Sequence, residues 1–346
     1  MGVPYAQAAD NLDAAANTLF KDSTIRSVGI GRHEDEYGFF VVRNSAQITP
    51  LGAMLGVRAA ASMKAVPQTI KSVPLVLREA MNDIVPHLKV PFSGPGSPTA
   101  SSHVIEQSTL RPLCGGLQIQ NFDNDVRTGV INQGFIIIGT LGCFVKLANG
   151  KPAILSNNHV VAGENHGKKG TDRILQAGAS AIVAGQQVAT LTDFIRIRPS
   201  AQGLNVGTGA ILNLIDAGVA TLVTGVAFGQ GYHPTRNMPK PTGNATPKVG
   251  DRVFKVGRTT GLTFGEVKSV ATIVGPVPYK DGPSWFARSI VIEGLNGTMF
   301  SDHGDSGSAI MRASGDVVGL LYAGNGTQTY ACPIDEVFKK LKCNLL

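Results

Sequence analysis

The sequence lacks the features that would place it in a membrane, a secretory pathway or a metal site. Residues 1–6 show no basic segment leading into an apolar segment and a cleavage site, which excludes a secretory signal there. No stretch reaches about 18 uncharged apolar residues, the length of a membrane span. The four cysteines have no metal-ligand spacing. These observations predict a cytoplasmic protein with reduced thiols, no metal, no cofactor and no membrane partner.

Charged and aromatic residues are also scarce. Charged residues make up 16% of the 346 residues and aromatic residues 6%, and the net charge is +7. The Lys and Arg residues form no cluster and no patch interleaved with aromatic side chains, so the sequence gives little support for a nucleic-acid partner. What the chain does contain is 42 glycines and many runs of Val, Ile and Thr. This composition favours β-structure over a helical bundle.

A segment rich in Pro, Gly and Ser divides the chain. Residues 91–103 cannot hold a regular helix or sheet, so we expect an exposed linker there. Residues 1–90 are expected to form a small α+β domain for regulation or assembly, by partner binding, self-association or covering a cleft. Its predicted elements are a helix over 5–20, a hairpin over 28–42, a helix over 51–63 and a strand over 73–77.

Beyond the linker, short apolar runs alternate with tight turns. The clearest turn is Asn149-Gly150, a strong hairpin signal, between the runs at 134–147 and 151–156. Many short strands joined in this way indicate barrels or a sandwich. Residues 104–346 are therefore expected to form one mainly β domain.

The most informative segment is residues 301–310, which contains Gly304-Asp305-Ser306-Gly307 and runs into an apolar stretch. A serine hydroxyl attacks a carbonyl only when a base takes its proton and backbone N–H groups face the oxyanion. Glycines at 304 and 307 let the chain turn tightly enough to present such groups. Alone, the motif is equally compatible with an ordinary turn, so its interpretation depends on a base elsewhere.

A histidine and an aspartate upstream supply the missing groups. His159 follows an apolar strand, at the start of a predicted helical turn from which its ring can extend into a cleft. Asp216 lies among apolar residues, where a buried carboxylate needs hydrogen bonds, and a histidine N–H is a suitable donor. Asp193 is the alternative partner for His159. With His159 as base, Ser306 is predicted to be a nucleophile.

In this order, His159, Asp216 and Ser306 resemble the trypsin-like serine peptidases across roughly residues 130–340. The resemblance implies two six-stranded β-barrels with the active site between them. Residues 257–261, Gly-Arg-Thr-Thr-Gly, resemble a structural hairpin of microbial and plant members. The N-terminal hairpin with Val28-Gly29-Ile30-Gly31, together with Leu155-Ser156-Asn157-Asn158-His159, resembles the bacterial and plant narrow-leaf-type members.

The resemblance also implies roles around the catalytic residues. The N–H groups of Gly304 and Ser306 would form the oxyanion hole. The strand that ends in Tyr322, Ala323 and Gly324 would pair with the substrate beside the first specificity pocket. The sequence identifies no partner for Asp305.

Two further residues are candidates for substrate binding. Phe300 stands where an acidic residue would select Arg or Lys, so a neutral pocket and small or apolar substrate side chains are expected. Asp302 nearby keeps a basic preference open, and core packing is an equal alternative for Phe300. His303 is expected at the rim of the cleft or on a solvated loop.

Three functions are compatible with this set of residues. The leading hypothesis is a serine endopeptidase that performs limited processing of protein or peptide substrates inside the cell. A peptide-binding scaffold on the same fold, with turnover slow or absent, and an esterase are the alternatives. The presence of all three triad residue types favours an enzyme.

Overall fold

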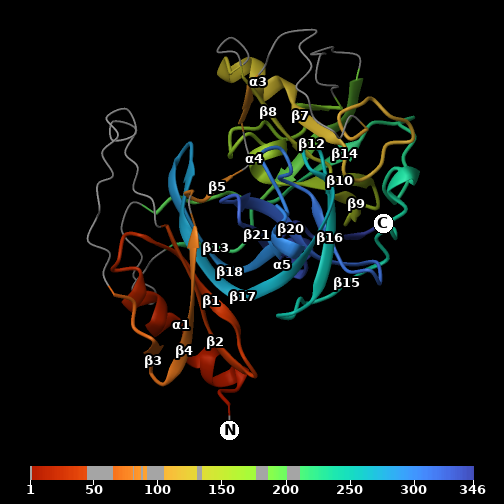
Figure 1. Ribbon diagram of the computed structural model, residues 1–346. Coiled ribbons are helices and arrows are strands. Elements are labelled where there is room, and N and C mark those ends of the chain that lie inside the picture. Colours follow the sequence, from red (N-terminus) through yellow and green to blue (C-terminus); the bar gives the residue numbers. More distant parts are fainter. Residues whose placement is uncertain are drawn as a thin grey trace.

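The computed structural model describes residues 2–44, 65–80, 82–86, 89–91, 105–130, 135–176, 186–200 and 211–346. The helix expected over 51–63 and residues 92–103 of the expected linker lie outside these ranges. The described chain is mainly β, with two barrels preceded by a helix and strands, as Figure 1 shows. The second barrel lies between the first barrel and the N-terminal elements.

The first barrel is a sheet of nine strands within the described residues. Their order is β22 (Cys343–Leu345), β9 (Cys143–Leu147), β10 (Pro152–Ser156), β14 (Gly218–Leu222), β12 (Gln187–Phe194), β11 (Arg173–Leu175), β7 (Gln118–Asn121), β8 (Phe135–Thr140) and β6 (Lys89–Pro91). The predicted Asn149-Gly150 turn joins β9 to β10, and Gly150 has a φ of +82° that favours glycine. Two short helices accompany this sheet, α3 (Phe122–Thr128) and α4 (Asn158–Val161).

The second barrel is a closed ring, because β18 pairs with both β17 and β21. Its strands are β16 (Arg252–Gly257), β17 (Gly261–Tyr279), β18 (Gly282–Gly294), β21 (Gln328–Pro333), β20 (Asp316–Gly324) and β19 (Ala309–Met311). Three short strands join this sheet: β13 (Leu212–Asn213) pairs with β18, whereas β15 (Gly243–Asn244) and β5 (Val85–Pro86) pair with β20. Helix α5 (Ile334–Leu341) follows β21.

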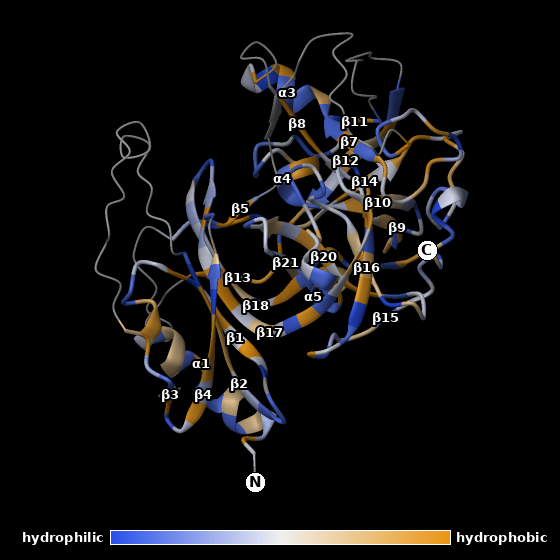
Figure 2. Cartoon of the chain, viewed as in Figure 1, coloured by the Kyte–Doolittle hydropathy of each residue, from blue (hydrophilic) through white to orange (hydrophobic). Residues whose placement is uncertain are grey.

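Apolar side chains fill the barrel interiors. Figure 2 shows hydrophobic residues along barrel strands such as β16 and β17. One buried cluster, which includes Val145, Phe254 and Tyr322, draws on both barrels. This shared core holds the two barrels together, so a site between them has fixed walls.

The N-terminal elements continue the sheet of the second barrel. They are α1 (Tyr5–Leu19), β1 (Ile25–His33), β2 (Glu36–Asn44), β3 (Thr69–Ile70) and β4 (Val73–Ala80). Strand β1 pairs with β17 over residues 27–31, β2 pairs with β1, and β4 pairs with β2. Helix α1 packs on this extension with Ile273 and Trp285 of the second barrel in one buried cluster. The boundary at residue 90 stays a prediction, since the sheet runs across it.

Candidate active site

His159 is held against Asp216 by the pairing of two strands. Strand β10 ends at Ser156, whose partner on β14 is Gly218, so the residues just beyond these positions are neighbours. His159 Nδ1 lies 2.5 Å from Asp216 Oδ2, and the His159 backbone N–H donates to Asp216 Oδ1 over 3.2 Å. Both side chains are fully buried. A carboxylate placed in this way fixes the orientation of the imidazole ring.

Two more contacts hold Asp216 in place. The Tyr279 hydroxyl donates to Asp216 Oδ2 over 2.8 Å, and the Asn157 side-chain amide donates to the Asp216 carbonyl over 2.7 Å. Burial, together with the neighbouring Asp216 carboxylate, raises the pKa of Tyr279 well above its usual value, so its hydroxyl remains a donor. Sequence reasoning missed Tyr279, because only the pairing of the long strand β17 brings its last residue to Asp216.

Asp193, the alternative partner, lies elsewhere. Its carboxylate is 2.5 Å from Lys169 Nζ, and its side chain is 47% exposed. In the described structure it therefore forms a surface ion pair. Of the two aspartates, Asp216 is the one bonded to His159.

Ser306 sits between the two barrels. Its carbonyl accepts from the N–H of Thr140 at the end of β8 over 2.7 Å, and the N–H of the next residue, Gly307, donates to Leu321 of β20 over 2.9 Å. Gly307 has a φ of +93°, and a Cβ there would lie 2.3 Å from the Thr140 carbonyl oxygen. Glycine is therefore required for the first barrel to approach this closely.

The candidate reactive atoms are buried and have no hydrogen bond within the described part of the chain. Ser306 Oγ and His159 Nε2 have no hydrogen-bond partner among the described residues. Within the same part of the chain, the hydrogen bonds of Gly304 and Ser306 use their carbonyls, which accept from the Thr140 side chain and backbone respectively. Their N–H groups are thus open to a further acceptor, as an oxyanion hole requires.

The partner of Asp305, which the sequence did not identify, is a buried lysine. Lys255 Nζ on β16 lies 3.2 Å from Asp305 Oδ2, and both side chains are fully buried. The Thr259 N–H and the Thr260 hydroxyl donate to the same carboxylate over 2.8 and 2.6 Å. Burial alone would raise the pKa of Asp305, but Lys255, with these hydrogen bonds and one from the Asp302 N–H, holds it below its usual value.

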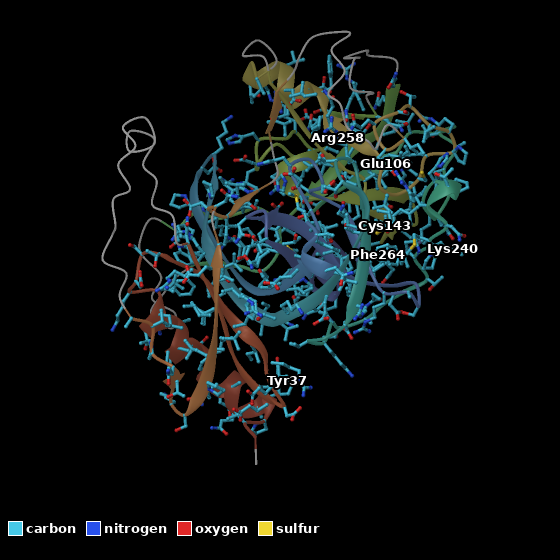
Figure 3. All side chains as sticks on the ribbon, in the orientation of Figure 1. Tyr37, Glu106, Cys143, Lys240, Arg258 and Phe264 are labelled. Carbon is cyan, nitrogen blue, oxygen red and sulfur yellow. The ribbon has the colours of Figure 1, made fainter. Side chains whose placement is uncertain are left out.

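The Gly-Arg-Thr-Thr-Gly hairpin thus supports the serine turn. Its arginine, Arg258, labelled in Figure 3, is buried and reaches the first barrel, where Nε donates to Gln118 Oε1 over 2.7 Å. Burial lowers the pKa of Arg258 to about 10. Sequence reasoning recognised this hairpin as structural but missed Lys255, two residues before it.

The residues expected to bind substrate lie in three different places. His303 lines a cavity of about 520 Å³ together with Tyr279 and Pro86. Tyr322 and Ala323 are buried in β20, which Gly324 ends. Phe300 is 1% exposed within an apolar cluster of the second barrel and does not line that cavity. Its contribution to a specificity pocket stays a prediction.

The remaining candidate groups are buried thiols. Cys114, Cys143, Cys332 and Cys343 are all free and buried. Among the described residues, no three His, Cys, Asp or Glu side chains gather as metal ligands do. None of the described helices combines the length and apolar character that crossing a membrane would demand.

Comparison with known proteins identifies the family. The family model for trypsin matches residues 131–338, more than half of the chain. The chain therefore belongs to the trypsin family, and its class is that of the serine-type endopeptidases. The predictions of a trypsin-like family and a chymotrypsin-like fold are confirmed. No curated protein matches the chain.

Several solved protease structures are similar to this chain over part of its length. Nocardiopsis protease is 15% identical, with coverage of 67% of this chain and 98% of that protein and a TM-score of 0.45. Thermobifida fusca protease A is 16% identical, with coverages of 68% and 98% and a TM-score of 0.44. Cellulomonas bogoriensis chymotrypsin is 17% identical, with coverages of 60% and 90% and a TM-score of 0.40.

Proposed function

We propose that this serine endopeptidase acts through a triad of His159, Asp216 and Ser306. The observation that carries the proposal is the fully buried 2.5 Å contact between His159 Nδ1 and Asp216 Oδ2. It leaves Nε2 as the free ring nitrogen. Ser156, three residues before His159, donates through Oγ to the carbonyl of Thr140, the residue whose N–H donates to the Ser306 carbonyl. An imidazole held in this tautomer can take a proton through Nε2.

The reaction follows from these positions. His159 Nε2 takes the Ser306 hydroxyl proton as Oγ attacks the scissile carbonyl, and Asp216 stabilises the imidazolium that forms. The Gly304 and Ser306 N–H groups bind the oxyanion, and loss of one such donor costs about 3 kcal/mol of transition-state stabilisation. The imidazolium then protonates the leaving amine. Water, activated by the same nitrogen, hydrolyses the acyl-enzyme and restores Ser306.

We further propose that the substrates are proteins or peptides and that the enzyme performs limited processing inside the cell. Four unpaired thiols support a reducing compartment. The neutral side chain of Phe300, packed in an apolar cluster, supports small or apolar side chains before the scissile bond.

A fluorophosphonate probe, which reacts with an activated serine, tests the triad. Wild-type protein should be labelled, Ser306→Ala should not, and Ser301→Ala is the matched control, because Ser301 Oγ bonds to Thr329 instead. Asp216→Asn should slow peptide turnover by about 10⁴-fold, whereas Asp193→Asn should not. Labelling that persists in Ser306→Ala contradicts the nucleophile assignment. Labelling without cleavage of casein or a peptide library favours the esterase or the latent scaffold.

A further inference from the structure

The far end of the β17–β18 hairpin projects beyond the ring of the second barrel. Its last residues, 277–279 and 282–284, pair with each other and with no further strand in the described part of the chain. One backbone bond from Ser200 also reaches this end. The end carries Tyr279, whose hydroxyl donates to Asp216. Two strands alone hold their shape poorly, so the position of Tyr279 depends on what fixes the hairpin tip.

The hairpin tip is bound by a turn of the first barrel. The tip consists of Lys280 and Asp281, between β17 and β18. The binding turn consists of residues 163–166, directly after helix α4, which carries His159. The Lys280 N–H donates to the carboxylate of Glu164, which is buried. This contact ties the end of the hairpin to the residues that follow His159.

The Asp281 carboxylate makes two more contacts with the same turn. Asn165 Nδ2 donates to Asp281 Oδ2 over 3.0 Å, and His166 Nε2 lies 3.0 Å from Asp281 Oδ1. The hydrogen bond from Asn165, together with the neighbouring charges of His166 and Arg196, lowers the pKa of Asp281 below its usual value. The carboxylate is therefore ionised at neutral pH, and each of its oxygens faces a separate side chain of the turn.

The side chain of Asn165 is fully used in this arrangement. Its oxygen accepts from Asn158 Nδ2 and from the Ile197 N–H over 2.8 and 2.9 Å. Its Nδ2 donates to the Ile197 carbonyl over 2.8 Å as well as to Asp281. The Asn165 backbone N–H donates in turn to Asn158 Oδ1 over 2.9 Å. An amide side chain has two acceptor and two donor positions, and all four are occupied here.

Asn158 connects these contacts to the catalytic pair. It is the first residue of α4, directly before His159, and it is fully buried. Its amide also donates to the Ile195 carbonyl over 2.7 Å. The Ile195 N–H donates over 3.0 Å to Ala217, the residue directly after Asp216. One connected set of hydrogen bonds therefore adjoins both His159 and Asp216.

The backbone of the turn needs this support. Gly163, Glu164 and Asn165 have φ values of +50°, +56° and +77°. Asparagine tolerates this left-handed region better than most residues, whereas glutamate does not. Residues held there persist only where the surrounding contacts fix them. Without its bonds to the hairpin tip, we expect the turn to relax and the end of α4 to move with it.

We propose that Asn165 and Asp281 are positioning residues of this peptidase. The contact between them holds the His159 ring in line with the Asp216 carboxylate, and this inference rests on the proposed function. Neither residue lines the cavity of about 520 Å³ in the described structure. Each therefore acts through a neighbour: Asn165 acts through the first residue of α4, and Asp281 acts through the hairpin end that carries Tyr279.

Steady-state kinetics on a peptide substrate test the proposal. Asp281→Ala should lower kcat by about 10- to 100-fold and change KM much less, because a small displacement of a catalytic group has an effect of this size. Asp281→Asn, which can still accept from Asn165, should keep most of the wild-type kcat. Asp193→Ala is the matched control, since it removes another partly exposed ion pair, and it should match wild type. Equal kcat in Asp281→Ala and wild type overturns the proposal.

A spectroscopic measurement separates alignment from folding. The proton on His159 Nδ1, bonded to a carboxylate, should resonate far downfield of the amide protons in the ¹H NMR spectrum. This resonance should shift or broaden in Asp281→Ala and stay in place in Asp281→Asn and Asp193→Ala, while urea unfolding shows all three variants to be folded. An unchanged resonance in Asp281→Ala contradicts the positioning role.

A double variant tests the route through Tyr279. Tyr279→Phe combined with Asp281→Ala should lose less kcat than the product of the two single losses, because both changes act on Asp216. Independent, fully multiplicative losses contradict a shared route.

Fluorophosphonate labelling of the same samples separates this inference from the proposed function. Wild-type protein that is not labelled overturns the proposed function, while the NMR comparison still decides the alignment of His159. Labelled wild-type protein together with an equal labelling rate in Asp281→Ala overturns the positioning role and leaves the triad standing.

Discussion

Asp216 is fully buried and accepts hydrogen bonds from the His159 ring, the His159 backbone N–H and the Tyr279 hydroxyl. A carboxylate removed from water is stable only when its oxygens are bonded in this way. The same bonds fix the orientation of the carboxylate toward the His159 ring. At the residue scale, the site therefore depends on donors that never touch the substrate as well as on those that do.

Tyr279 is the donor that a single substitution removes most cleanly. Tyr279→Phe should lower kcat about 10-fold and leave KM nearly unchanged, because a hydrogen bond to a charged group contributes about 1.5–3 kcal/mol. Tyr322→Phe is the matched control, since that buried hydroxyl bonds to Ser289 Oγ instead. Steady-state kinetics on a peptide substrate provide the measurement. Equal losses in the two variants would contradict a positioning role for Tyr279.

Asp125 shows how burial controls the charge of another carboxyl group. It is fully buried on α3, accepts only the Ile137 N–H among the described residues, and burial raises its pKa to about 7. Because this folded-state pKa lies above the unfolded one, the native state binds more protons between about pH 4 and pH 7. The free energy of unfolding should therefore fall as pH rises through this window.

Asp125→Asn tests this predicted fall in the free energy of unfolding with rising pH, since the amide cannot ionise. The variant should match wild type near pH 4 and be more stable at pH 8, by about 1.4 kcal/mol for each unit of pKa difference. Asp123→Asn on the same helix is the control: hydrogen bonds from Arg173 lower the pKa of Asp123, so its removal should destabilise at neutral pH. Urea unfolding at both pH values provides the measurement. An unchanged pH slope in Asp125→Asn would refute the assignment.

At the scale of elements, the hairpin of β16 and β17 acts as a support for the serine turn. Its lysine and two threonines hold the Asp305 carboxylate, while Arg258 extends from the same hairpin to β7 of the first barrel. A turn that presents two N–H groups to an oxyanion must be fixed to within a fraction of an ångström. The buried ion pair between Lys255 and Asp305 helps to hold the turn in this position.

Lys255→Met should destabilise the chain by about 3–5 kcal/mol, because it leaves the buried Asp305 charge without its partner. Fluorophosphonate labelling should slow as well, since the serine turn loses its support. Adding Asp305→Asn should recover part of the stability. Lys268→Met on the same hairpin removes a partly exposed pair with Glu266 and should cost at most about 1 kcal/mol. Chemical denaturation provides the measurement. Equal losses in the free energy of unfolding for the two lysine variants would contradict this account.

Short sequence motifs predicted most of the candidate site residues. The others are brought to the site only by the pairing of strands. His159 and Ser306 stand in short motifs, and the order of the three residues indicated the fold. Tyr279 and Lys255 stand in apolar strands with nothing local to mark them, and they act 63 and 50 residues away in sequence from Asp216 and Asp305. Such contacts depend on register and bulges in β17, which periodicity does not reveal.

At the scale of the whole molecule, the N-terminal elements and the second barrel share one sheet. The pairing of β1 with β17 joins them through the backbone, and the apolar face of α1 covers the join. The sequence predicted the helix, the hairpin and the strand of this region, but not the pairing of the hairpin with the second barrel.

Trp285 is the only tryptophan in the chain, and it lies in that interface, 8% exposed, with its ring 4.9 Å from that of Phe20. Phe20 belongs to the N-terminal region and Trp285 to β18 of the second barrel. Indole emission is sensitive to the polarity around the ring, so the protein carries a single indole fluorophore at the interface between its N-terminal elements and the second barrel. The wavelength of its emission maximum reports whether the N-terminal elements are packed against the second barrel, without any label and independently of the state of Ser306.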